Sequence, residues 1–205
     1  MVKIACLTQR PIQTIILLYL LGKYNYKFDI IIYSPLKDKK SKYNNEGSAS
    51  IKALEYQCIM QNIPLIKINN LNSIKIIRLM KKNKIKTSFA LITDTILNKK
   101  ILNCFSKGVY MTHGGILPKF RGVDANKWAL LKKKKFIGLT MIKLGAGVDN
   151  GDIIQVKKIK VKTNNINKLE SDLYYRFKLY MYKNLFIKIK NNQKVKLTKQ
   201  KKIYP

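Results

Sequence analysis

The first half of the chain alternates short apolar runs with longer segments in which apolar residues recur at helical spacing. The apolar runs predict four strands, at residues 2–7, 28–33, 64–68 and 88–92. The segments that follow these strands predict four helices, at residues 11–21, 48–62, 73–84 and 98–105. A polar, charged stretch at 37–47 predicts a loop. Strand–helix alternation at this spacing is typical of a mostly parallel sheet with helices on both faces.

The pattern changes in the second half of the chain. An apolar run ends at His113, and Asp124 is placed to cap a helix that continues to Leu131. The remaining apolar positions predict strands at 136–144 and 153–161, a polar turn between them at 145–152, and a closing helix at 167–190. No repeat or linker interrupts this order. We therefore predict an α/β fold, a single Rossmann-like domain over residues 1–205, whose sheet is parallel at first and mixed at its late edge.

Composition excludes several classes of protein. Hydrophobic residues make up 46% of the chain and charged residues 25%, which is ordinary for a globular domain. Cys6, Cys58 and Cys104 are widely spaced and form no Cys-x-x-Cys pair, which argues against a disulfide framework or a metal site. The longest apolar run, at 15–21, is too short to span a bilayer, and no signal-peptide cleavage site follows it. We expect a cytoplasmic protein.

The net charge of +32 resembles that of a nucleic-acid-binding protein, but its distribution points elsewhere. Only four of the 42 basic residues are arginines, and the lysines occur in every segment. Lysine, isoleucine and asparagine share A/T-rich codons, so genome composition explains much of the excess. Denser patches lie at 81–86, 132–135 and 194–202. We interpret most of the charge as a solvated surface and keep a nucleic-acid partner as an alternative.

His113 is the only histidine, and its neighbours make it the first candidate for chemistry. It lies in the stretch at 108–122, GVYMTHGGILPKFRG, where a single imidazole can serve as acid, base or charged donor. Residues 93–95 and 111–113 both follow apolar runs, at the carboxyl ends of predicted strands, where ligands of parallel sheets bind. A second polar turn, GAGVDNGD, contains Asp149. The structural alternative is that His113 only caps a buried strand.

These two motifs, in this order and joined by an apolar run, resemble the formyltransferase family. That family includes glycinamide-ribonucleotide formyltransferase, methionyl-tRNA formyltransferase and the nucleotide-sugar N-formyltransferases. The resemblance is specific over residues 89–161 and compatible with the whole chain. It implies the Rossmann-like formyltransferase fold and the transfer of a formyl group from 10-formyltetrahydrofolate to a primary amine.

The resemblance also implies roles for individual residues. His113 would stabilise the developing oxyanion and handle a proton, and Asp149 would orient the imidazole and relay the proton through water. The alternative for Asp149 is a turn aspartate that bonds its own backbone. The folate would rest against two stretches of backbone, formed by Thr93, Asp94, Thr95, Ile96 and Leu97 and by Ala146, Gly147 and Val148. The acceptor would meet Arg10, Gly114, Gly115, Lys119 and Arg121.

Three neighbouring features allow more than one interpretation. Arg121 can either hold its loop by bonding carbonyls or meet an anionic acceptor through its guanidinium group. Leu117-Pro118 is interpreted as a rigid bend after His113. Trp128, on the predicted helix after this loop, is predicted to lie in the core.

The chain departs from the family pattern at Met111. The family carries an asparagine at this position, two residues before the histidine, whose amide donates to the formyl oxygen. Residues i and i+2 of a strand share a face, so Met111 is predicted to point into the site with His113. A thioether cannot donate a hydrogen bond, and losing one oxyanion donor costs about a hundred- to a thousandfold in turnover. Asn126 and Asn150 are candidate replacements for this donor; without one, the enzyme is slow or the fold has lost the chemistry.

The acceptor is the least determined feature. After the closing helix no sequence remains for the C-terminal domain that methionyl-tRNA formyltransferases carry, so none is expected. The first predicted strand is not followed by the glycine-rich turn of the glycinamide enzyme, although Arg10 can meet a phosphate there. An amino-sugar nucleotide or another small amine is the leading expectation. The alternatives are a methionyl-tRNA formyltransferase-like catalytic domain and a degenerate fold that binds folate or RNA without turnover.

Overall fold

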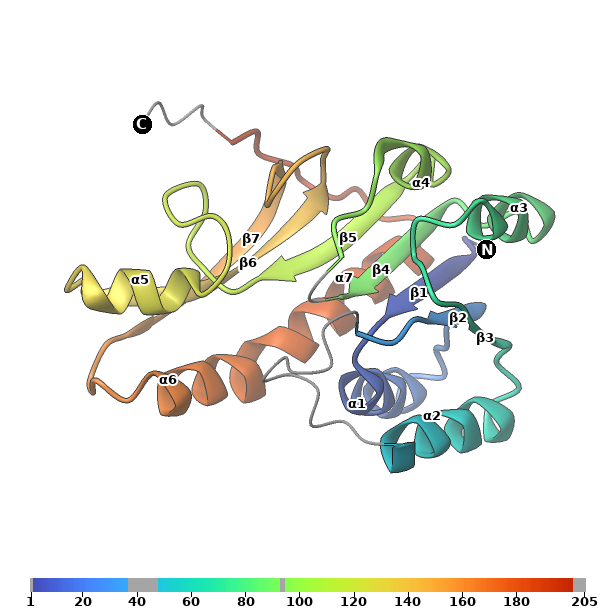
Figure 1. Cartoon of the computed structure of the whole chain (residues 1–205), viewed down its shortest axis with the longest axis horizontal. Coiled ribbons are helices and arrows are strands. Elements are labelled where there is room, and N and C mark those ends of the chain that lie inside the picture. The colour runs from blue at the N-terminus through green and yellow to red at the C-terminus, as the bar shows by residue number, and fades with distance from the viewer. Residues whose placement is uncertain (1, 37–47, 93–94, 201–205) are drawn as a thin grey trace.

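A computed structural model describes residues 2–36, 48–92 and 95–200 of the chain (Figure 1). These residues form an α/β fold around one seven-stranded sheet, with strand order β3-β2-β1-β4-β5-β6-β7. The strands are β1 (Ile4–Thr8), β2 (Ile30–Tyr33), β3 (Leu65–Lys67), β4 (Thr87–Leu91), β5 (Gly108–His113), β6 (Phe136–Leu144) and β7 (Gly151–Lys160). The first five pair in parallel, and β6 and β7 are antiparallel. The predicted Rossmann-like sheet with a mixed late edge is confirmed.

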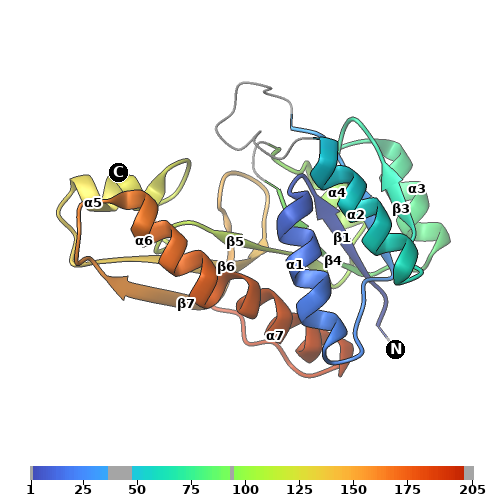
Figure 2. The same ribbon diagram turned by 90° about the horizontal axis from the view of Figure 1, so that it is seen from below.

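Helices cover both faces of this sheet. They are α1 (Pro11–Gly22), α2 (Ser48–Met60), α3 (Ile74–Lys82), α4 (Lys99–Asn103), α5 (Ala125–Leu131), α6 (Ile166–Leu173), the π-helical segment η1 (Tyr174–Lys178) and α7 (Leu179–Lys190). Figures 1 and 2 show α1, α2, α6 and α7 on one face and α3 and α4 on the other.

Two apolar cores fill the space between the sheet and these helices. Because successive side chains of a strand point to opposite faces, Ile4 and Cys6 of β1 belong to the first core, whereas Ala5 and Leu7 belong to the second. The first core packs against α1, α2, α6 and α7, and the second against α3 and α4. Both faces of the central strands are covered, so β1, β2 and β4 are buried at every position and do not alternate between buried and exposed residues.

Side-chain caps mark the start of three helices, α3 and α4 where the sequence predicted them and α6 slightly earlier than predicted. Ser73, Asn98 and Asn165 each accept a hydrogen bond from a backbone N–H of the first turn. Asp124 occupies the N-cap position of α5 but gives no cap bond, since its backbone is left-handed (φ 55°) and its carboxylate pairs with Lys127. The predicted loop at 37–47 lies outside the described residues.

The closing helix differs from its prediction. It begins at Ile166 and is interrupted by η1, none of whose residues is buried. In an uninterrupted α-helix, Met181 and Leu185 would be rotated away from the face of Leu169 and Leu173. A π turn takes up about one extra residue, and this returns all four side chains to the first core.

The prediction that Trp128 lies in the core is wrong. Its side chain is 55% exposed on α5, and Leu131 one turn later is 72% exposed. The helix buries Ala125, Asn126 and Ala129 instead, which are small or polar residues. Trp128 and Leu131 therefore form part of the surface, whereas Leu130 packs against the first core.

Candidate active site

His113 is the last residue of β5, and its ring is 7% exposed. Thr112, the residue before it, points to the first core, where its N–H donates to the Tyr182 hydroxyl at 2.9 Å. Met111 packs against the second core. Strand alternation therefore puts Met111 and His113 on the same side of β5, as the sequence predicted, and Thr112 on the other.

The sheet opens between β4 and β5 just before His113. Their pairing runs from Thr87↔Gly108 to Phe89↔Tyr110. Beyond it, the Tyr182 hydroxyl of α7 bridges the two strands, since it accepts from the Thr112 N–H and donates to the Ala90 carbonyl at 2.8 Å. Burial raises the pKa of Tyr182, which keeps this hydroxyl protonated. Tyr182 was not predicted from the sequence, because its partners belong to Ala90 and Thr112, which are far away along the chain.

The loop after His113 packs tightly against the imidazole. A Cβ on Gly115 would stand 2.6 Å from His113 Nε2 and 2.7 Å from the Ala125 Cβ, so only glycine fits there. Thr140 of β6 fixes the same turn, because its hydroxyl donates to the Gly115 carbonyl at 2.6 Å and accepts from the Leu117 N–H at 3.1 Å. The Leu117-Pro118 bond that follows is cis. Gly115 thus has a packing role beside the acceptor role that the resemblance implies.

Asp149 reaches the other side of the same imidazole. Its Oδ2 lies 3.2 Å from His113 Nδ1 and accepts a hydrogen bond of 2.8 Å from the Gly122 N–H. Burial works to raise the pKa of Asp149, but the hydrogen bond and charge of His113, the Gly122 N–H and the charge of Arg121 together lower it. The predicted closeness of His113 and Asp149 is confirmed by this distance. A turn aspartate bonded only to its own backbone is not what the structure shows.

Both ring nitrogens of His113 face an oxygen. Nε2 lies 2.7 Å from the Phe120 carbonyl, opposite the Asp149 contact of Nδ1. A neutral imidazole has one N–H and satisfies one of these acceptors, whereas an imidazolium donates to both. In the conformation observed, the ring is therefore held between two acceptors, one at each nitrogen.

The two candidate replacements for the missing donor differ in their surroundings. Asn150 is exposed, and its Nδ2 donates to the Ala146 carbonyl within the same turn. Asn126 is 2% exposed, and its Oδ1 accepts from the Gly138 N–H. Its Nδ2 makes no hydrogen bond with any described residue and lies 4.0 Å from where a Cβ on Gly114 would stand. Asn126 is therefore the better placed of the two.

The two stretches expected to meet folate approach the second core from opposite sides of β5. Leu97 is buried in that core, and Met111 and Leu144 pack against it. Thr95 is buried and accepts from the amide of Gln9, a residue that the sequence did not single out. Of the remaining positions, Ile96 is 63% exposed and Ala146, Gly147 and Val148 are also exposed, whereas Thr93 and Asp94 lie outside the described residues.

The residues expected to meet the acceptor do not form one cluster. Arg10 is the N-cap residue of α1, at the carboxyl end of β1, and Gly114 and Lys119 are exposed in the loop after His113. Arg121 bonds the C-terminal segment rather than a carbonyl of its own loop. Its Nε and one terminal nitrogen donate to Gln200 Oε1, at 3.2 and 2.8 Å.

A hollow of about 310 Å³ lies beside the Asp149 turn. Its lining comes from the β6–β7 hairpin and the C-terminal segment: Lys143, Leu144, Gly145, Asn150, Gly151, Asp152, Lys199 and Gln200. A larger hollow of about 500 Å³ lies between β7 and α7 and includes none of the candidate residues. Among the described residues, no helix is long and apolar enough to cross a membrane.

Comparison with known proteins agrees with this geometry. Residues 66–185 match the family model described as "Formyl transferase", which is more than half of the chain. Methionyl-tRNA formyltransferase of Prochlorococcus marinus (strain MIT 9215) is 30% identical over 194 residues, which is 93% of this chain and 58% of that protein. The chain belongs to the formyltransferase family, as its motifs predicted.

Solved structures share the fold at lower identity. Phosphoribosylglycinamide formyltransferase from Anaplasma phagocytophilum superposes with a TM-score of 0.74 at 14% identity, covering 93% of this chain and 88% of that one. An N-formyltransferase from Helicobacter canadensis, solved with folinic acid and dTDP-3-aminofucose, has a TM-score of 0.66 at 20% identity and covers 99% of this chain and 69% of that one. The chain spans just over half the length of its methionyl-tRNA formyltransferase relative.

Proposed function

We propose that this protein transfers a formyl group from 10-formyltetrahydrofolate to a primary amine. The observation that carries the proposal is the His113–Asp149 contact of 3.2 Å at the opening between β4 and β5. The formyltransferase family and a structural neighbour solved with folinic acid support a folate donor. The apolar side chains of Leu97, Met111 and Leu144, gathered at one core beside this opening, fit the flat ring of such a donor.

In the proposed reaction the donor supplies the formyl group, and the side chains of the chain manage charge and protons. As the amine nitrogen attacks the formyl carbon, negative charge develops on the formyl oxygen, and an imidazolium at His113 stabilises it. The amine nitrogen must also lose a proton, which passes through water to Asp149. As the bond between the formyl carbon and the donor nitrogen breaks, the ring gives its proton to that leaving nitrogen, and the proton from the amine replaces it. Asp149 holds Nδ1, so Nε2 is the nitrogen that faces the reacting groups. During turnover Nε2 therefore releases the Phe120 carbonyl and contacts the reacting groups instead.

The leading acceptor is an amino-sugar nucleotide or another small amine. Arg10 at the start of α1 supports a phosphate-bearing acceptor, because a helix N-terminus and a guanidinium group both favour an anion. The test is turnover with 10-formyltetrahydrofolate against a panel of amino-sugar nucleotides, with His113→Gln as the control. Tight folate binding without turnover on any amine would instead support the non-enzymatic, folate-binding alternative.

Methionyl-tRNA is the second candidate acceptor. Several relatives are named methionyl-tRNA formyltransferases. On the surface next to the site, Trp128 and Leu131 are exposed, and residues 132–135, all lysine, are exposed directly after α5. Lysines beside an aromatic ring are typical of surfaces that bind nucleic acid. Formylation of methionyl-tRNA in the same assay, with no turnover on the sugar panel, would select this candidate.

A further inference from the structure

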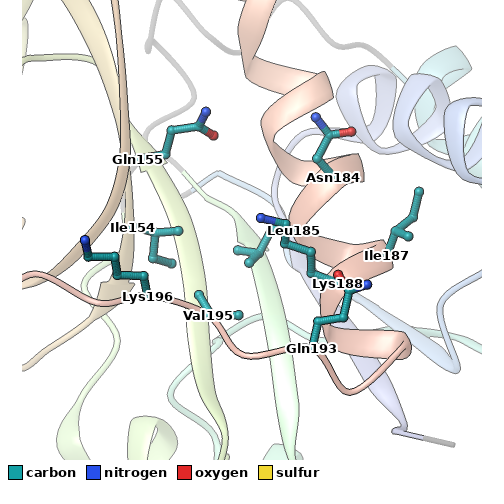
Figure 3. A pocket seen from close by; sticks show the side chains of 9 residues that line it. All are labelled: Ile154, Gln155, Asn184, Leu185, Ile187, Lys188, Gln193, Val195 and Lys196. Carbon is teal, nitrogen blue, oxygen red and sulfur yellow. The ribbon is translucent and has the colours of Figure 1, made fainter.

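The segment after α7 is attached to the site by few contacts. This C-terminal strap, residues 193–200, turns back after α7 and runs past β7 (Figure 1). It pairs with β7 at a single bridge, Ile153↔Thr198. Between the strap and α7 lies the hollow of about 500 Å³, with Gln193, Val195 and Lys196 along its edge (Figure 3). The strap is therefore held to the body of the protein at Val195, which packs against the first core, at the Thr198 bridge, and at Gln200.

The side chain of Gln200 joins the C-terminal strap to two other parts of the chain, the Asp149 turn and the Arg121 loop. Its Nε2 donates to the carbonyls of Asp149 and Gly151, at 2.9 and 2.7 Å. Its Oε1 accepts from two nitrogens of Arg121. The side chain is half-buried, and each hydrogen-bonding atom of its amide group is used.

The Asp149 turn and the Arg121 loop, which Gln200 joins, also hold His113 in place. Gly122, next to Arg121, donates to the Asp149 carboxylate, and that carboxylate contacts Nδ1 of His113. Within the Asp149 turn, Asn150 Nδ2 donates to the Ala146 carbonyl, but residues 146–148 are exposed and Asp149 adopts a left-handed backbone (φ 45°) that non-glycine residues seldom occupy. The hydrogen bond from Gln200 to the backbone carbonyl of Asp149 thus acts as a clamp on this turn and fixes the direction in which the carboxylate points.

We propose that Gln200 is a positioning residue, which keeps the Asp149 turn and the Arg121 loop together so that Asp149 meets His113. The proposal rests on the proposed function for its effect on turnover, but its effect on the imidazole does not depend on that function. It also means that the C-terminal strap completes the site, although Gln200 lies about 50 residues beyond Asp149 in the sequence.

Two substitutions separate the two halves of the clamp. Gln200→Ala removes all four hydrogen bonds. Gln200→Glu keeps an acceptor for Arg121 but loses the amide donor, and it places a carboxylate next to two carbonyls. Gln193→Ala is the matched control, since Gln193 is an exposed glutamine of the same strap whose side chain bonds no described residue.

The first measurement is the ¹⁵N spectrum of the imidazole, which has one source because His113 is the only histidine. Both Gln200 variants are expected to shift the Nδ1 signal, whereas Gln193→Ala leaves it unchanged. The second is steady-state turnover, where Gln200→Ala lowers kcat about tenfold or more with little change in the KM for the amine, because misplaced groups slow the chemical step.

The outcomes keep the two proposals apart. An unchanged Nδ1 signal in both Gln200 variants, with the fold intact by circular dichroism, overturns the positioning role. A shifted signal in a protein that formylates no amine supports the clamp and contradicts the proposed function. If Gln200→Ala unfolds the protein, the Nδ1 signal of the Gln200→Glu variant at neutral pH tests the positioning role instead.

Discussion

Each ring nitrogen of His113 faces an acceptor from a different part of the chain, and this arrangement decides how the residue can act. Asp149 comes from the β6–β7 hairpin and the Phe120 carbonyl from the loop after β5. The contact with Asp149 was predicted from the two motifs, whereas the contact with the Phe120 carbonyl was not. Three predictions test the residues that set this geometry.

The first prediction concerns Asp149 and the dependence of folding stability on pH. The pKa of Asp149 is lowered from its ordinary value of 3.8, so the folded state favours the ionised carboxylate. A group of this kind adds stability above its ordinary pKa and loses it as the pH falls through the lowered value. Urea unfolding should show wild type more stable than Asp149→Asn at pH 5, with the difference shrinking below pH 3.8. A difference that grows on acidification below pH 3.8 would contradict the assignment.

The second prediction uses two adjacent glycines. Gly115→Ala puts a methyl group 2.6 Å from His113 Nε2, so the ring or the loop must move, and turnover should fall about a hundredfold. Gly114→Ala is the control, because the nearest atom to its added methyl group lies 4.0 Å away. The comparison of kcat in the two variants is the measurement. Equal losses would point to a direct acceptor contact at both glycines rather than to packing of the ring.

The third prediction tests the hydrogen-bond donor that Met111 lacks. If the amide of Asn126 replaces it, Asn126→Asp keeps the acceptor for Gly138, removes the amide donor, and should lower turnover about a hundredfold or more. Met111→Asn alone should change little, but it should restore part of the loss in the double variant. A large gain from Met111→Asn alone would show that the wild type has no replacement donor. Unchanged turnover in every variant would contradict the oxyanion argument itself.

At the scale of elements, Tyr182 connects the closing helix to the opening of the sheet. Tyr182→Phe leaves the Thr112 N–H and the Ala90 carbonyl without this partner in a buried position, which typically costs about 1–3 kcal/mol. Denaturant unfolding should show that loss, and Tyr175→Phe, at a 74% exposed position, is the control. A loss of similar size in the two variants would mean that the bridging hydroxyl contributes nothing specific.

The sequence predicted the elements well where periodicity and caps agree. Strands β1 and β2 are largely apolar runs, and Ser73 and Asn98 have the side chains that begin a helix. The π turn could not be predicted, because it corrects the register of distant side chains against the core rather than following a local signal. Trp128 was placed in the core, but α5 packs through Ala125, Asn126, Ala129 and Leu130, which leaves Trp128 exposed. Gln9, Tyr182 and Gln200 were missed for the same reason: their partners are far away in the sequence.

At the scale of the whole molecule, the net charge of +32 leads to a prediction about polyanions. Lysines spread over every segment cannot all meet the phosphates of one bound RNA, so we expect weak binding and a shallow dependence of log affinity on log salt. The measurement is the anisotropy of a labelled RNA between 50 and 200 mM salt, an interval in which roughly six to ten phosphate contacts would cost about a thousandfold or more.

Two fourfold lysine-to-alanine variants separate background charge from a dedicated surface. One removes the exposed lysines at 132, 133, 134 and 135 beside Trp128, and the other removes those at 81, 82, 84 and 86 on and after α3. Background charge predicts equal, modest losses of affinity in the two variants, because each removes the same number of charges. Nanomolar binding at physiological salt, with a steep slope abolished only by the first variant, would instead mark α5 and the segment after it as an RNA surface. The substrate amine that is formylated next to His113 would then be expected on a tRNA rather than on a sugar nucleotide.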